Sequence, residues 1–111
     1  MFKTVVAPSS DLDAAKKIYS AVLGEPHTDA PYYVGWSVGE QEFGLNPQGH
    51  QQGQIGPTPY LAVDDVAAAV AAMVEAGATT RQEPTQVGGG TTVALVADTD
   101  GGLLGLISHA G

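Results

Sequence analysis

The residues that most often perform chemistry in proteins are spread thinly along this chain of 111 residues. Its three histidines, His27, His50 and His109, lie far apart, and no two have the spacing that places metal ligands on one helical face. There is no cysteine, which excludes disulfides, thiolate metal sites and a cysteine nucleophile. We therefore expect the histidines to be surface side chains.

Two short motifs resemble chemical sites but lack an essential residue. The run from Gly88 to Gly90 is not followed by the Gly-Lys-Ser/Thr of a phosphate-binding loop. The run from Asp98 to Gly101 begins like a calcium loop, but no glutamate stands at the closing position. Both runs are therefore predicted to be turns. No serine lies in a nucleophile-elbow pattern.

The charge and the hydropathy exclude several partners. Twelve acidic and four basic residues give a formal charge of −8, which repels phosphate backbones, so no nucleic acid is expected to bind. The charge serves solubility, or alternatively attracts a cationic ligand. No apolar run reaches the roughly 20 residues of a membrane helix, and Met1-Phe2-Lys3 opens into a strand without a signal-peptide pattern. We expect a cytoplasmic protein without a membrane partner.

The two halves of the chain repeat one plan. In residues 4–24 and again in residues 58–77, a short apolar run leads to an acidic residue, a helical segment and a glycine. A shift of 54 residues places Thr4 on Thr58 and Asp11 on Asp65. The repeat indicates two copies of one strand–helix unit.

Helix signals accompany each copy. Ser10, with Asp13 three residues later, is the predicted N-cap of a first helix over residues 11–23, which Gly24 ends. A second helix is predicted over residues 66–76. The predicted packing faces are Leu12, Ala15, Tyr19, Val22 and Leu23 in the first helix, and Val66, Val70, Met73 and Val74 in the second.

Alternating residues predict the strands. Residues 32–38 and 41–46 flank Gly39-Glu40, a two-residue hairpin turn. One face of this hairpin is apolar and the other is small and polar, with Val34, Trp36, Phe43 and Leu45 on the first and Tyr33, Gly35, Ser37, Glu42, Gly44 and Asn46 on the second. Residues 78–87 form a predicted edge strand because Pro84 interrupts them, and residues 91–97 and 103–108 form the last strands.

Three stretches together resemble the vicinal oxygen chelate superfamily of glyoxalases, bleomycin-resistance proteins and extradiol dioxygenases. They are Asp11-Leu12-Asp13-Ala14-Ala15 through Ile18-Tyr19 to Val22-Leu23-Gly24; Val63-Asp64-Asp65-Val66 with Gly77-Ala78; and Asp98-Thr99-Asp100-Gly101-Gly102-Leu103-Leu104-Gly105-Leu106. The resemblance implies an α+β fold with two βαβββ modules whose mixed sheet curves into a cup. It implies a single glyoxalase-like domain over residues 1–111, with modules at about 1–50 and 55–111, a connector at about 47–57, and commonly a homodimer.

The same resemblance implies four metal-ligand positions, which fall at Thr4, Thr58, Gly105 and, as the best match, Asn46. Threonine hydroxyls are poor ligands for a divalent transition metal, and glycine offers no side chain. We therefore expect no metal and no cofactor.

Two hypotheses remain. The first is a metal-free small-molecule-binding protein of the bleomycin-resistance type, which sequesters a drug or metabolite. Its site would comprise Thr4, Val6, Tyr33, Ser37, Glu42, Asn46, Thr58, Tyr60, Ala62, Gly105 and Ile107, with Val93 or Leu95 in the wall. The alternative is a glyoxalase-like enzyme, of the lyase, isomerase or dioxygenase type, that lacks the usual metal site. Glu42 or a tyrosine would then act as acid or base, although no partner for Glu42 is visible in the sequence, and we favour binding.

Overall fold

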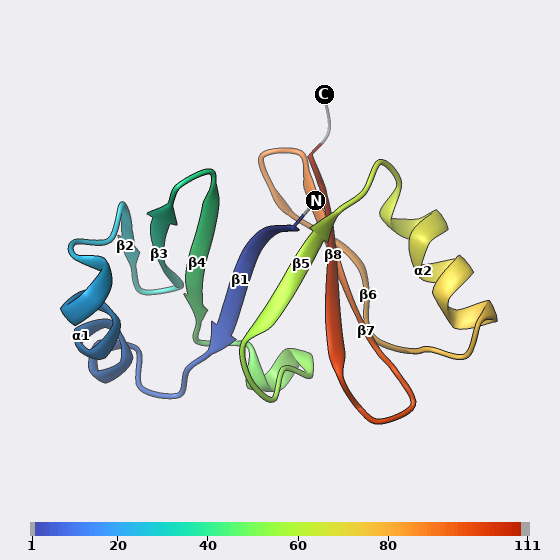
Figure 1. Cartoon of the computed structure of the whole chain (residues 1–111), viewed down its shortest axis with the longest axis horizontal. Coiled ribbons are helices and arrows are strands. Elements are labelled where there is room, and N and C mark those ends of the chain that lie inside the picture. Colours follow the sequence, from blue (N-terminus) through green and yellow to red (C-terminus); the bar gives the residue numbers. More distant parts are fainter. Residues whose placement is uncertain (1, 110–111) are drawn as a thin grey trace. The chain divides into compact units, whose positions relative to one another are not determined.

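The computed structural model describes residues 2–109 and contains two modules of order βαβββ, the order that the family resemblance implies (Figure 1). Module one comprises β1 (Phe2–Pro8), α1 (Leu12–Leu23), β2 (Thr28–Ala30), β3 (Tyr33–Val38) and β4 (Gln41–Asn46). Module two comprises β5 (Thr58–Ala62), α2 (Val66–Glu75), β6 (Thr79–Gly88), β7 (Thr91–Ala97) and β8 (Leu103–His109). The described chain divides into two compact units, residues 3–58 and residues 59–109, and Phe2 is grouped with the second. A short 3-10 helix, η1 (His50–Gln52), lies in the segment before Thr58.

The strands of module one follow the order β2-β3-β4-β1, with β1 parallel to β4 and the other pairs antiparallel. The tight hairpin is confirmed, because Val38 pairs with Gln41 and Trp36 pairs with Phe43 across the Gly39-Glu40 turn. Gly39 has a φ of 63°, which only glycine adopts at little cost. The sequence did not predict β2, which is only three residues long.

The start of α1 differs from the sequence prediction by one residue. Asp11, not Ser10, is the N-cap, and its side chain accepts a hydrogen bond of 3.0 Å from the Ala14 amide. Asp65 repeats this arrangement at the start of α2, where its carboxylate accepts from the Ala68 amide at 3.0 Å. The two caps occupy equivalent positions of the repeat, and each satisfies a free N–H of the first helical turn.

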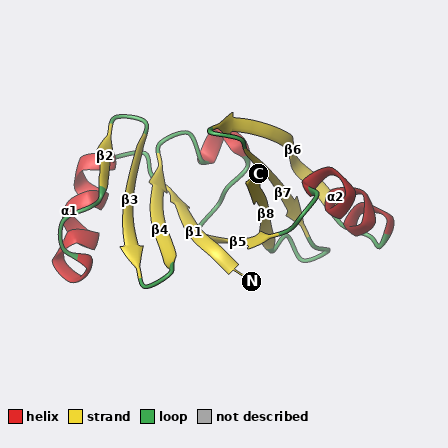
Figure 2. Cartoon of the chain, turned by 90° about the horizontal axis from the view of Figure 1, so that it is seen from above, coloured by secondary structure: helices red, strands yellow, loops and turns green. Residues whose placement is uncertain are grey.

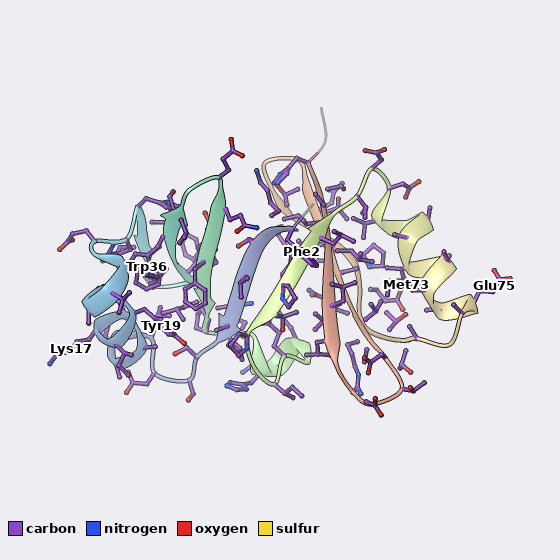
Figure 3. The ribbon with its side chains drawn as sticks, viewed as in Figure 1. Phe2, Lys17, Tyr19, Trp36, Met73 and Glu75 are labelled. Carbon is purple, nitrogen blue, oxygen red and sulfur yellow. The ribbon has the colours of Figure 1, made fainter. Side chains whose placement is uncertain are left out.

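The core of module one lies between α1 and one face of its sheet (Figure 3). Trp36 is 1% exposed, and its indole N–H donates to the Gly24 carbonyl at 2.9 Å, which links the end of α1 to β3. Val22 is an exception to the predicted packing face, because it is 87% exposed near the end of the helix. The buried members of this core are Ala7, Val34, Trp36 and Leu45, against which Leu12, Ala15, Tyr19, Leu23 and Phe43 pack.

Module two has the strand order β5-β8-β7-β6, and α2 lies beside these strands (Figure 2). The predicted edge position of β6 is confirmed, since it pairs with β7 alone and its register shifts around Pro84. Val66 and Val70 are buried on the sheet as predicted, whereas Val74 is 44% exposed and does not belong to the core. Neither helix in residues 2–109 has the length and apolar character that a membrane crossing requires.

Candidate functional site

The helix-free face of module one carries the polar residues that the sequence placed there. Strand register aligns Thr4 on β1 with Glu42 on β4 and Ser37 on β3. The next row runs from Val6 through Gly44 to Gly35. Because side chains alternate along a strand, these residues point away from α1, whose partners Ala7 and Trp36 lie on the other face.

Glu42 has two side-chain partners on this face, so the expectation that it lacks a partner is wrong. The phenol of Tyr33 donates a hydrogen bond to Glu42 Oε2. Glu42 Oε1 lies 2.9 Å from Nε2 of His27. The other ring nitrogen of His27, Nδ1, lies 2.7 Å from the hydroxyl of Thr28. A connected chain of four side chains therefore contains a phenol, a carboxylate and an imidazole, three groups that can exchange protons.

Solvent reaches this network. The side chains of His27 and Glu42 are 39% and 35% exposed, so a ligand can approach both. The Tyr33 hydroxyl and His27 engage one oxygen each, and a carboxylate can accept further hydrogen bonds through its remaining lone pairs. His27 also forms an ion pair with Glu42 whenever its imidazole is protonated.

Two glycines determine where the Tyr33 ring lies. A side chain at Gly44 would overlap the phenol, and a Cβ at Gly35 would lie 2.8 Å from Tyr33 Cε2. Gly35 and Gly44 are paired residues on β3 and β4, so the ring rests on a patch of bare backbone. The glycines thus bring the hydroxyl of Tyr33 within reach of Glu42.

His27 is the member of this network that sequence reasoning missed. Its side chain is 39% exposed, in agreement with the predicted surface position, but its backbone N–H donates to the Gly35 carbonyl at 2.9 Å. The following residue, Thr28, pairs with Gly35 at the start of β2. This pairing brings His27 to Glu42, and the only signal in the sequence was the three-residue β2 itself.

The helix-free face of module two is largely apolar. Tyr60, Gly105 and Leu95 form one row across β5, β8 and β7. Ala62, Ile107 and Val93 form the next row. Tyr60 is 7% exposed, and its burial raises the pKa of the phenol above the ordinary value of 10.0. Leu95 is fully buried and Ile107 is buried too, so of these apolar side chains Ala62 and Val93 are the ones that reach solvent.

The remaining predicted site residues have more limited roles. Ser37 and Ala62 are exposed, and Val6 is half-buried. Asn46 uses both ends of its amide near the connector, since Nδ2 donates to Gln52 Oε1 at 2.8 Å and Oδ1 accepts from the Gln48 amide at 2.9 Å. Asn46 is therefore held by its own loop.

The positions that correspond to metal ligands do not fit a divalent metal. Thr4 is buried and donates its hydroxyl to the Glu42 carbonyl at 2.8 Å. Thr58, its counterpart, is fully buried and donates to the Gly56 carbonyl at 2.9 Å. A side chain at Gly105 would overlap the ring of Tyr60. Within residues 2–109, no group of three or more His, Cys, Asp or Glu residues is placed to hold a metal ion.

Comparison with known proteins gives a consistent result. The family model of the Glyoxalase/Bleomycin resistance protein/Dioxygenase superfamily matches residues 2–106. No curated protein sequence matches the chain. Similar solved structures include the NAD-dependent benzaldehyde dehydrogenase from Legionella pneumophila, which is 17% identical with a TM-score of 0.74 over 96% of this chain and 98% of that chain.

Two further structures are similar over most of their length. A glyoxalase/bleomycin resistance protein/dioxygenase superfamily member from Vibrio splendidus is 15% identical, with a TM-score of 0.70 over 97% of this chain and 99% of that chain. The methylmalonyl-CoA epimerase from Mycobacterium tuberculosis is 17% identical, with a TM-score of 0.65 over 99% of this chain and 88% of that chain. At these identities the likeness shows a shared fold and carries no information about activity.

Proposed function

Because the chain belongs to the glyoxalase/bleomycin resistance protein/dioxygenase superfamily, we propose that it binds a small molecule without a metal ion and sequesters it. The site lies on the helix-free face of module one, centred on Glu42. The observation that carries the proposal is the Glu42 carboxylate itself, which is 35% exposed and is held by Tyr33 and His27. A fixed carboxylate on an open face is a ready acceptor for a ligand N–H or O–H group.

The surroundings of Glu42 define the ligand class. Gly35 and Gly44 have no side chains, so the Tyr33 ring lies directly on their backbone. Val6 adds an apolar side chain in the same row. A flat and partly apolar molecule fits this surface. The net charge of −8 favours a ligand with a cationic or neutral hydrogen-bond donor over an anion.

We propose a second contact surface on the helix-free face of module two. Ala62 is exposed there, whereas Tyr60, Leu95 and Ile107 are buried, so Ala62 would supply contact area for an apolar ligand and the buried side chains would shape this surface. Tyr60→Ala then weakens binding. His50→Ala, a change in η1, leaves the affinity unchanged and serves as the control.

The Tyr33–Glu42–His27 network favours a second candidate function, a metal-free acid–base enzyme. In this alternative Glu42 removes a proton from carbon next to a carbonyl group, and Tyr33 or His27 donates a proton to the oxygen. The test is proton–deuterium exchange in a panel of carbonyl compounds, followed by NMR in D2O. An enzyme accelerates exchange in the wild type and loses this activity in Glu42→Gln, whereas a binding protein gives the same exchange rate as buffer.

A thermal-shift screen of metabolites and antibiotics in the presence of a chelator tests the binding proposal. A ligand of this site raises the melting temperature of the wild type and has at least about tenfold lower affinity for Glu42→Gln, because a charge-assisted hydrogen bond is lost. Glu40→Gln is the matched control, since Glu40 is exposed in the hairpin turn two residues away. Equal affinities of the two variants would reject Glu42 as the centre of the site.

We also propose that both modules act as one domain over residues 1–111, and that the chain is a cytoplasmic homodimer with twofold symmetry. Superfamily membership and exposed apolar side chains outside the cavity lining, such as Val87, support the dimer. Light scattering at micromolar concentration is expected to give twice the chain mass. A monomer mass throughout this range would contradict the dimer.

A further inference from the structure

A cavity of about 440 Å³ opens between α1 and the sheet of module one. It lies on the helix-bearing side, because Val5 and Phe43 alternate with Thr4 and Glu42, whose side chains point to the opposite face. Thr4 and Glu42 also belong to the lining, so β4 borders both the cavity and the Tyr33–Glu42–His27 network, whereas Tyr33 and His27 lie outside the lining. Its volume falls in the range of sites that take small molecules, roughly 300–1,000 Å³.

The floor of the cavity is aromatic. The ring centroids of Tyr19 on α1 and Phe43 on β4 lie 4.7 Å apart with an interplanar angle of 50°. Trp36 backs both rings, with each centroid 6.1 Å from that of the indole. Trp36 is fixed by its own hydrogen bond to Gly24, so the floor is a rigid surface against which a flat ligand can pack.

The rim of the cavity exposes apolar side chains to water. Val22, in the last turn of α1, is 87% exposed, and Val38, at the end of β3, is 45% exposed. Ile18, one turn before Val22, is 69% exposed. Polar residues normally occupy such positions, and exposed apolar side chains in the lining of a cavity are typical of a binding site.

The lining contains no basic side chain. The nearby ammonium group of Lys16 on α1 is engaged by Asp29, at 3.0 Å. Gln41 is the polar side chain at the mouth, and the Thr4 hydroxyl already donates to the Glu42 carbonyl. An anionic ligand would find no cationic partner in this lining and would be repelled by the net charge of −8.

We propose that this cavity is a second ligand site, which takes an uncharged, flat, largely apolar molecule of about two rings. A cavity of about 150 Å³ holds one benzene ring, so a volume near 440 Å³ accommodates a larger ring system. The ligand stacks on Tyr19 and Phe43 and covers Val22 and Val38.

Titration with N-phenyl-1-naphthylamine, an uncharged two-ring probe that fluoresces in apolar surroundings, tests the proposal. The wild type is expected to bind one probe per chain with saturation. Val22→Asp and Val38→Asp are each expected to weaken binding about tenfold or more, because apolar contact is lost and a carboxylate must lose water when the probe binds. Both residues are exposed, and circular dichroism checks that the variants remain folded.

Ile55→Asp is the matched control. Ile55 is 80% exposed, lies outside the cavity, and the change adds the same charge. The affinity of Ile55→Asp for the probe should stay within about twofold of the wild type, as should that of Tyr33→Phe, because Tyr33 contacts Glu42 but does not line the cavity. This result would show that the probe binds in the cavity independently of the ligand site proposed at Glu42.

Three outcomes would overturn the proposal. The first is no saturable binding to the wild type, and the second is an equal loss of affinity in Ile55→Asp and the two rim variants. The third is a wild-type dimer that excludes the probe, together with a Val22→Asp monomer, which would identify the cavity as an interface between two copies of the chain.

Discussion

The ring of Tyr60 lies over Gly105, its paired residue on the neighbouring strand, so that a Cβ at position 105 would overlap the ring. Tyr33 lies in the same way over Gly44 in module one. A metal-binding side chain at position 105 would have to displace the Tyr60 ring. Packing as well as residue type therefore disfavours a ligand at that position.

Replacing Gly105 with alanine should destabilise the protein by about 1–3 kcal/mol, because the new methyl group meets the buried Tyr60 ring. Urea denaturation gives the free energy of unfolding. Gly56→Ala is the control, since a Cβ at Gly56 meets nothing within 4 Å. Equal stabilities of the two variants would show that Tyr60 moves aside freely.

Purified protein should contain far less than one zinc, nickel, iron or manganese ion per chain. The hydroxyls of Thr4 and Thr58 donate to backbone carbonyls, and Gly105 has no side chain. Elemental analysis after mild dialysis measures the metal content. About one ion per chain, lost together with thermal stability on addition of a chelator, would contradict the metal-free site.

The N-cap assignment predicts different effects for two adjacent residues. Asp11→Ala should cost about 1 kcal/mol of stability, because the Ala14 amide loses its acceptor. Ser10→Ala should cost much less, since Ser10 does not cap the helix. Thermal or urea unfolding gives the stability of both variants. A larger loss of stability in Ser10→Ala would show that Ser10 is the N-cap.

Stability should fall at high pH partly through Tyr60. Burial raises the pKa of its phenol above 10.0, so the folded state holds this proton more tightly than the unfolded state. The contribution is fully present below about pH 10 and is lost as the pH rises through the folded-state pKa. Melting temperatures between about pH 9 and 11.5 should decline less steeply in Tyr60→Phe than in the wild type.

Tyr32→Phe provides the comparison for this pH dependence, because Tyr32 is 75% exposed. Its melting curve should follow that of the wild type over the whole range. If Tyr60→Phe declines as steeply as Tyr32→Phe, the buried phenol does not contribute.

The sequence predicted the elements well where a strong period or a turn signal exists. The hairpin at Gly39-Glu40 and the polar face around Glu42 follow from strand alternation alone. The sequence does not distinguish Ser10 from Asp11 as the N-cap, because both residue types cap helices. The choice depends on whether the helical backbone begins one residue earlier or later.

The features that the sequence did not predict depend on long-range contacts. Val22 and Val74 continue the apolar period of their helices, but neither belongs to the core of its module, and both are exposed. His27 reaches Glu42 only through β2, a strand too short for a period to reveal. The network around Glu42 therefore required the three-dimensional structure.

An NMR titration with a ligand from the screen, performed in the presence of a chelator, tests whether the chain binds this ligand at Glu42 without a metal ion. Saturable shifts are expected in the backbone amides of Thr28, Gly35 and Gly44, near Glu42. The amide of Gly77, at the exposed end of α2, should remain in place. Binding that requires a divalent metal, or shifts that leave Gly35 and Gly44 unchanged, would contradict a metal-free site at Glu42.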